Sequence, residues 1–139
     1  MICEDLIILI ITAVALHIFV DFHLQGLLAD LKQQRWWLDN VFSKGFSHRY
    51  DKDYLAALII HGLEWSIFVH IPFLIMVYLH YPEISVILLG SVLLHAILHA
   101  FIDDLKCNRL KLSLIQDQLL HFGQIIVIIV TYIVAINYI

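Results

Sequence analysis

The segment ISVILLGSVLLHAILHAFID, residues 84–103, decides the fold. It is as long as the roughly 20 mainly apolar residues that cross the hydrocarbon of a bilayer as a helix. Its only ionisable residues are His95, His99 and the terminal Asp103. Three more runs share this length and character, and we predict spans at about 6–24, 54–79, 84–102 and 119–138. The pattern predicts an all-α integral membrane four-helix bundle that forms a single transmembrane domain over residues 1–139.

The overall composition excludes an ordinary soluble domain. Hydrophobic residues make up 62% of the chain and charged residues only 14%. Soluble domains have about 45–50% apolar and about 25% charged residues, so a soluble core could not bury this much apolar surface. Membrane lipids are therefore the expected surroundings. The formal net charge of -4 provides no excess of basic residues for binding a nucleic acid, and we expect no nucleic-acid partner.

The basic residues predict the orientation in the membrane. All eight lie in two predicted loops, 26–53 and 104–118: Lys32, Arg35, Lys44, Arg49, Lys52, Lys106, Arg109 and Lys111. Basic loops stay in the cytoplasm, so we expect both loops inside and both termini outside a prokaryotic inner (plasma) membrane. Within the first loop, residues 27–38 have apolar positions at near-helical spacing and include Trp36 and Trp37. This pattern is typical of an interfacial helix with aromatic anchors.

Polar residues within the spans form a second pattern. They are His17, Asp21 and Gln25 in the first span, His61 and Glu64 in the second, His95, His99 and Asp103 in the third, and Asp117, Gln118 and His121 at the start of the fourth. Spacings of three or four residues put each set on one helix face. Because successive spans run in opposite directions, all four sets come to the same cytoplasmic level. Ionisable residues are costly inside a membrane and usually mark function there.

A short internal repeat accompanies these polar residues. The stretch His17-Ile18-Phe19-Val20-Asp21 resembles His99-Ala100-Phe101-Ile102-Asp103. Each copy is followed by a basic loop and then by a span with an early histidine. The repeat predicts two pseudo-symmetric helical hairpins, related by an axis along the membrane normal.

The polar residues are of the types that bind divalent metal ions. Metal sites in helical bundles are built from His and carboxylate side chains on facing helices, and this donor set suits zinc, and also iron or manganese. We expect a divalent ion, with zinc as the first choice. One ligand set would be His17, Asp21 and His61, and the other His99, Asp103 and His121; they could hold one ion or a pair ~3.5–4 Å apart. The alternative is a hydrogen-bond network that joins the helices.

Neighbouring residues have supporting roles in this hypothesis. Asp117 and Glu64 are candidates for a general base, or for orienting a ligand. His95, one turn deeper, could contact a ligand or the substrate. Gln25 and Gln118 would donate hydrogen bonds. Lys32 and Lys106, with Arg35, would hold a phosphate or carboxylate headgroup at the rim of the site.

The same motifs carry a resemblance to a known family. They are His17-x3-Asp21-Phe22-x-Leu24-Gln25, a following Lys32, then His61, then His95-x3-His99-x3-Asp103-x2-Lys106, and Asp117-Gln118-x2-His121. Over nearly its whole length the chain resembles the domain of unknown function 3307 family, small membrane proteins of prokaryotes and their phages. More loosely, it is similar to small membrane proteins described as metal-dependent hydrolases. The resemblance implies a prokaryotic membrane protein and leaves the activity open.

We therefore expect a metal-dependent membrane hydrolase that acts on an amphiphilic or lipid-linked small molecule at the cytoplasmic face. The ion would lower the pKa of a water molecule toward ~7, and Asp117 or Glu64 would take its proton. Two other classes remain open. One is a small transporter or ion- and proton-binding bundle, in which a homodimer would supply more spans. The other is a regulatory membrane factor that uses the His and Asp cluster as a scaffold.

Overall fold

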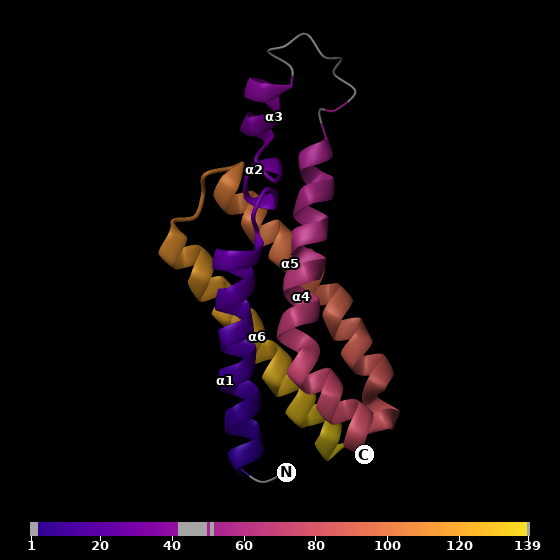
Figure 1. The fold of residues 1–139 in the computed structure, drawn as a ribbon. Coiled ribbons are helices and arrows are strands. Elements are labelled where there is room, and N and C mark those ends of the chain that lie inside the picture. The colour runs from indigo at the N-terminus through magenta and orange to yellow at the C-terminus, as the bar shows by residue number, and fades with distance from the viewer. Residues whose placement is uncertain (1–2, 42–49, 51, 139) are drawn as a thin grey trace.

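The computed structural model describes residues 3–41, 50 and 52–138, and the regular structure of these residues is entirely helical. The elements in chain order are α1 (Cys3–Phe19), the π-helical turn η1 (Val20–Leu24), α2 (Leu28–Leu31), α3 (Gln34–Asn40), α4 (Asp53–His80), the 3-10 turn η4 (Pro82–Ile84), α5 (Ser85–Cys107) and α6 (Leu114–Asn137). Lys44 and Arg49 of the predicted first loop lie outside the described residues. Figure 1 shows the arrangement.

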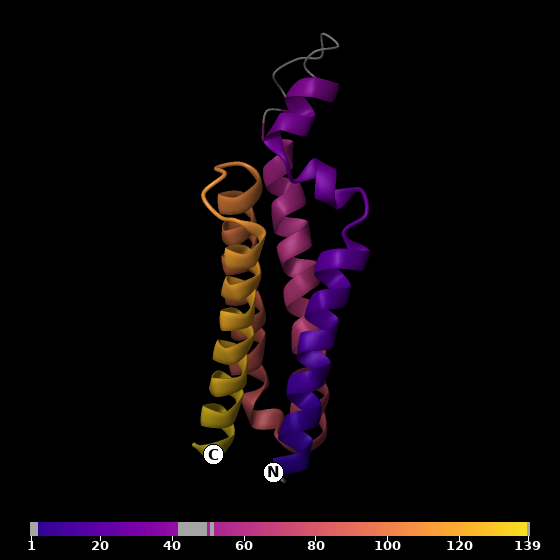
Figure 2. The ribbon, with the colours of Figure 1, turned by 90° about the vertical axis from the view of Figure 1, so that its left-hand side faces the viewer.

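Four helical segments are long and apolar enough to cross a membrane: Asp5–Leu24, Asp53–His80, Pro82–Cys107 and Leu114–Asn137. They lie side by side in an elongated bundle (Figures 1 and 2). The N- and C-termini lie together at one end, here called the terminal end, whereas α2 and α3 lie at the other, the loop end. Large apolar side chains such as Val86 and Ile97 cover the outer surface.

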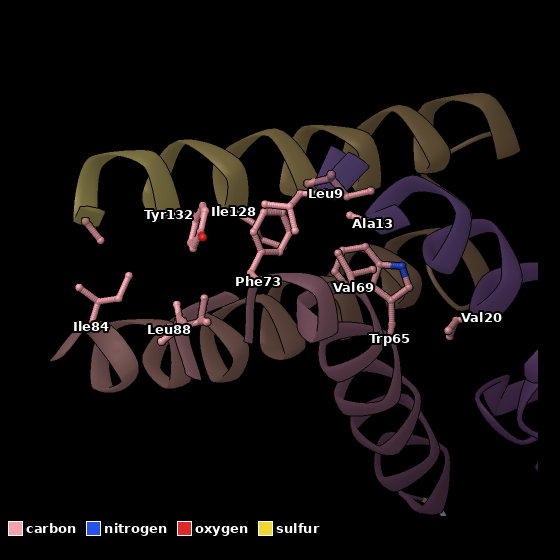
Figure 3. Close-up of a cluster of buried hydrophobic side chains, with 13 residues drawn as sticks. Leu9, Ala13, Val20, Trp65, Val69, Phe73, Ile84, Leu88, Ile128 and Tyr132 are labelled. Atoms are coloured by element: carbon pink, nitrogen blue, oxygen red, sulfur yellow. The ribbon is translucent and has the colours of Figure 1, made fainter. Parts of the chain in front are cut away.

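The inner faces of the helices pack through apolar side chains over the terminal half of the bundle (Figure 3). Val69, Phe73 and Ile128 are completely buried, and the rings of Phe73 and Tyr132 lie 5.2 Å apart. Within a membrane, close packing of this kind is a main source of helix association. The interior of the terminal half is therefore mainly apolar, with the buried His70 beside Val69 as an exception, in contrast to that of the loop end.

Helices α4 and α5 approach each other closely at Gly62. A Cβ atom at this position would lie 2.4 Å from the backbone oxygen of Ala96 and 3.2 Å from the side chain of Ala100. Small residues at helix contacts allow such close approach in membrane bundles. The contact brings the neighbouring residue His61 to His99, with ring centroids 5.1 Å apart.

Helix boundaries at the loop end differ from the sequence predictions. α5 continues to Cys107 and α6 begins at Leu114, so the predicted loop 104–118 shrinks to residues 108–113. Ser113 starts α6 with a capping box: its hydroxyl accepts from the Gln116 N–H, and the Gln116 side chain accepts from the Ser113 N–H. The interfacial helix predicted over residues 27–38 is broken at Lys32 and Gln33 into α2 and α3.

Candidate metal centre

Histidine and aspartate side chains from every long helix meet inside the bundle toward its loop end. They are His17 on α1, Asp21 on η1, His61 on α4, His99 and Asp103 on α5, and Asp117 and His121 on α6. The four imidazoles and Asp117 are completely buried, and the side chains of Asp21 and Asp103 are each 4% exposed. The shared level expected from the sequence is therefore present.

Two groups of potential ligand atoms converge, and His99 belongs to both: Asp21, His61 and His99, and His99, Asp103 and His121. In the first group, Asp21 Oδ1 lies 3.5 Å from His61 Nε2 and 3.7 Å from His99 Nε2. In the second, Asp103 Oδ1 lies 3.5 Å from His121 Nε2. The other oxygen, Asp103 Oδ2, lies 3.6 Å from His61 Nε2 and 3.9 Å from His99 Nε2.

These separations match ligands around an ion better than hydrogen bonds. An N–H···O hydrogen bond spans about 2.7–3.2 Å. Nitrogen and oxygen ligands lie about 2.0–2.2 Å from a tetrahedral zinc ion, and hence roughly 3.3–3.6 Å from each other. The buried His and Asp groups could therefore hold a metal ion.

Hydrogen bonding among the described residues leaves the cluster-facing atoms unsatisfied. The Nε2 atoms of His61, His99 and His121 are buried and have no hydrogen-bond partner there, and neither have Asp21 Oδ1 and Asp117 Oδ1. Buried polar atoms are nearly always hydrogen-bonded, so unsatisfied ones require an explanation such as an ion. Five such atoms from α4, α5, α6 and η1 lie at one level, where they could be ligands of a metal ion.

Each carboxylate of the cluster is fixed through one oxygen by a donor outside it. Gln118 Nε2 donates to Asp21 Oδ2 over 3.3 Å and to Asp117 Oδ2 over 3.0 Å. Lys106 Nζ donates to Asp117 Oδ2, and Lys32 Nζ donates to Asp103 Oδ2, both over 2.6 Å. These contacts leave Asp21 Oδ1 and Asp117 Oδ1 to face the imidazoles.

The three imidazoles are oriented by different contacts with residues around the cluster. His121 Nδ1 donates to Gln124 Oε1 over 3.1 Å, so the neutral ring presents its Nε2 lone pair to the cluster. Glu64 Oε2 lies 3.9 Å from His61 Nδ1, on the side of the ring away from the cluster. The His99 ring stacks against Trp65, with centroids 4.4 Å apart, and against His121, at 4.1 Å. Ligating histidines commonly have a hydrogen-bond partner at the second ring nitrogen, and of these three rings His121 has one among the described residues.

Comparison with known proteins adds no relative. No family model, no curated protein and no solved structure matches the chain. The resemblance to the domain of unknown function 3307 family therefore stays a prediction, and the site must be interpreted from its own geometry.

His17, expected in the first ligand set, lies beside the cluster but in neither group of converging atoms. Its Nδ1 accepts a hydrogen bond from Trp65 Nε1–H over 2.8 Å, which occupies the nitrogen nearest Asp21. His99 takes its place next to Asp21 and His61. Nothing in the spacing of the sequence shows that the Trp65 N–H would reach His17.

Gln25, expected to donate to the site, instead donates to the backbone oxygen of Asp21. The reason is local. Residues 20–24 form a π-helical turn, which is wider than an α-turn and shifts the residues that follow. Gln25 then satisfies a carbonyl at the helix end, just before Gly26 turns the chain with φ of +45°. π-Turns are frequent at functional sites, and this one carries Asp21.

Lys32 is not at an open rim, contrary to the expected headgroup role. It is 7% exposed, and its ammonium lies on Asp103 inside the loop end. The break between α2 and α3 allows this, and Asn108 fixes the break: it donates to the Lys32 backbone oxygen and accepts from the Gln34 N–H. Lys106 is partly exposed and is bound to Asp117. Both lysines thus compensate carboxylates of the cluster.

His95 belongs to a separate polar network deeper in the bundle. Its Nδ1 donates to the Ser91 backbone oxygen over 2.9 Å, and its ring faces His70 at 5.6 Å. His70 Nδ1 donates to the Ser66 backbone oxygen over 2.7 Å, and its Nε2 is 3.0 Å from Ser91 Oγ. Gln124 links the two regions, through a 3.4 Å hydrogen bond to the His95 backbone oxygen. The contact between His70 and Ser91 joins α4 to α5.

Proposed function

We propose that this protein is an integral membrane, metal-dependent hydrolase whose site lies toward the loop end, at the cytoplasmic face of a prokaryotic inner membrane. One observation carries the proposal. Buried imidazole Nε2 atoms and carboxylate oxygens face each other at 3.4–3.9 Å, and no hydrogen-bond donor of the described residues lies between them. Where these imidazoles present an Nε2 lone pair, it faces a carboxylate oxygen, and a bound divalent cation would turn that repulsion into coordination.

The contrast with the deeper network supports a metal rather than a structural role. At least one nitrogen of His70 and of His95 is hydrogen-bonded to a backbone oxygen, and the described atoms of that network have partners. A polar network that only joined helices would likewise leave few buried atoms without a partner, because each unsatisfied buried group is costly in a membrane. The cluster near the loop end instead keeps its facing atoms unsatisfied.

Hydrolysis fits the arrangement of the residues around the ligands. A divalent ion at the cluster would supply Lewis-acid chemistry and lower the pKa of a water molecule toward ~7. Asp117 Oδ1, buried 3.4 Å from His121 Nε2, is placed to take the proton of that water. Glu64 lies behind His61 and would orient that ring rather than act as a base. We propose zinc because imidazole and carboxylate ligands with tetrahedral spacing suit it.

The apolar packing inside the terminal half favours hydrolysis over transport as the function. Beyond the cluster, Val69, Phe73 and Ile128 fill the space between the helices. A carrier or channel needs a polar route through the membrane, whereas a hydrolase needs access from one side only. An amphiphilic substrate fits because the site lies inside an apolar bundle and beneath a linker that carries Trp36 and Trp37, residues typical of the membrane interface.

The test is metal content and metal-dependent turnover of the detergent-purified protein. We expect bound zinc in the wild type, loss of at least half of it in His99→Gln and His121→Gln, and retention in the matched variant His70→Gln, a buried histidine outside the cluster. Hydrolysis of a panel of amphiphilic esters should stop in chelator and return with zinc. Wild-type protein without any bound divalent metal, or activity that persists in chelator, would contradict the proposal.

A further inference from the structure

His99 cannot be a metal ligand in both groups of ligand atoms at once. An imidazole Nε2 atom has a single lone pair and binds one ion. His99 Nε2 is close to carboxylate oxygens of both groups, 3.7 Å from Asp21 Oδ1 and 3.9 Å from Asp103 Oδ2. If two ions bind, a ligand other than His99 must connect them.

Asp103 is placed to make that connection. Its two carboxylate oxygens face different imidazoles: Oδ2 is 3.6 Å from His61 Nε2, and Oδ1 is 3.5 Å from His121 Nε2. A carboxylate that points its oxygens at two ligand sets can bridge two ions, which in two-metal hydrolases lie ~3.5–4 Å apart. The Lys32 ammonium holds Oδ2 from outside, and so restricts rotation of the carboxylate.

We propose that the cluster holds two divalent ions bridged by Asp103, one with Asp21 and His61 and the other with His99 and His121, and that the substrate is a phosphate ester. This inference rests on the proposed hydrolase function and adds the number of ions and the substrate class. Asp117 stays outside the ligand sets, next to His121, as the proton acceptor.

The charge balance leads to the substrate class. Asp21, Glu64, Asp103 and Asp117 contribute four negative charges, and Lys32 and Lys106 two positive ones. With neutral imidazoles the site carries two negative charges, which one divalent ion would cancel and two would reverse to two positive charges. A buried site with excess positive charge favours an anionic substrate, because few water molecules are present to screen the charge. A phosphate group on an amphiphile provides that anion.

The reaction follows from these positions. A water oxygen forms a bond to phosphorus while the phosphorus–oxygen bond to the leaving alcohol breaks. One proton of the water goes to Asp117 Oδ1 and then to the leaving alkoxide, so that the products are inorganic phosphate and a neutral alcohol. No oxidant or second substrate is needed.

The experiment loads the chelator-treated full-length protein with Mn²⁺ in detergent and measures both stoichiometry and the electron paramagnetic resonance spectrum. We expect two ions per chain and a spin-coupled spectrum in the wild type, and one uncoupled ion in His61→Gln and in His121→Gln. The matched variant His70→Gln should keep two coupled ions. One ion per chain in the wild type, or two without spin coupling, would overturn the bridged pair but leave the hydrolase proposal intact. No bound ion would overturn both.

The substrate class has its own readout. Inorganic phosphate added to the Mn²⁺-loaded wild type should change the coupled spectrum, whereas sodium chloride at the same ionic strength should not. Phosphate should be released from a phosphatidate in mixed micelles but no fatty acid from an uncharged diacylglycerol. An unchanged spectrum together with diacylglycerol cleavage would overturn the phosphate-ester assignment.

Discussion

At the scale of single residues, the function of a histidine here depends on which of its nitrogens already has a partner. His121 donates through Nδ1 to Gln124, so its Nε2 lone pair faces Asp103 and Asp117. His17 is equally buried, but its Nδ1 accepts a hydrogen bond from the Trp65 N–H. Two completely buried imidazoles at one level therefore have different chemistry, and the difference is set by residues that bind no metal.

The Gln124 side chain offers a direct test of this dependence. Gln124→Leu removes the oxygen that accepts from His121 Nδ1 and should weaken metal binding about 10–100-fold, the usual effect of losing such a partner. The conservative variant Gln124→Glu keeps an oxygen acceptor and should bind within a few-fold of the wild type. Competition with a chelating dye would measure both affinities. Equal affinities for wild type and Gln124→Leu would show that the hydrogen bond does not orient the ligand.

Sequence analysis located the cluster residues but could not assign their contacts. Spacing of four residues shows that His17 and Asp21 share a helix face, and the direction of the spans shows their depth. Neither indicates that Trp65 on another helix reaches His17, because that contact depends on how far α1 is rotated about its axis. Gln124 was missed for another reason. Its position three residues after His121 put it on the right face, but its uncharged side chain did not draw attention to it.

At the scale of elements, the α2–α3 linker completes the site. The sequence predicts one interfacial helix over residues 27–38, yet the chain leaves the helical path at Lys32 and Gln33. Asp103 provides the reason, because its carboxylate would otherwise have no cationic partner outside the cluster, and Lys32 reaches it at 2.6 Å. A propensity argument cannot anticipate this, since a distant ion pair outweighs the local preference for a continuous helix.

The Lys32 ion pair predicts a metal-dependent stability. Lys32→Met leaves Asp103 buried and uncompensated, which should lower the free energy of unfolding by about 3–5 kcal/mol in metal-free protein. Bound metal should reduce this loss, because the ion pairs with the same carboxylate. The control is Arg35→Met on α3, where the Arg35 side chain is 89% exposed in its pair with Asp39, so the loss should stay under about 1 kcal/mol.

Thermal unfolding in detergent, with zinc and with chelator, measures both variants. A Lys32→Met protein that unfolds at the wild-type temperature in chelator would show that Lys32 does not stabilise the loop end. If the loss of unfolding free energy is equal with and without zinc, the Lys32 ion pair stabilises the protein independently of the metal centre. The comparison with Arg35→Met excludes a general effect of removing a basic residue from the linker.

At the scale of the whole molecule, the chain has a polar half and an apolar half. Both termini lie at the apolar end, and every described lysine and arginine lies at the other, at the end of α2, in α3, in the last turn of α5 and in the turns before α4 and α6. The hydropathy pattern was sufficient to predict four long helices, because any span must satisfy its backbone hydrogen bonds internally. The ends of the helices were less predictable, since capping at Ser113 and the extension of α5 to Cys107 depend on polar contacts rather than hydropathy.

The division into two halves predicts a topology in which α5 and α6 are connected in the cytoplasm and the C-terminus lies outside. In a Cys3→Ser and Cys107→Ser background, a cysteine appended after Ile139 should react with a membrane-impermeant maleimide in intact spheroplasts. Lys111→Cys, in the turn between α5 and α6, should react only after lysis, because basic turns are retained in the cytoplasm. Equal labelling of the two sites before lysis would show that the chain does not separate its ends across a membrane. The reverse pattern would place the metal centre at the outer face, where its substrate would be an extracellular or periplasmic phosphate ester rather than a cytoplasmic one.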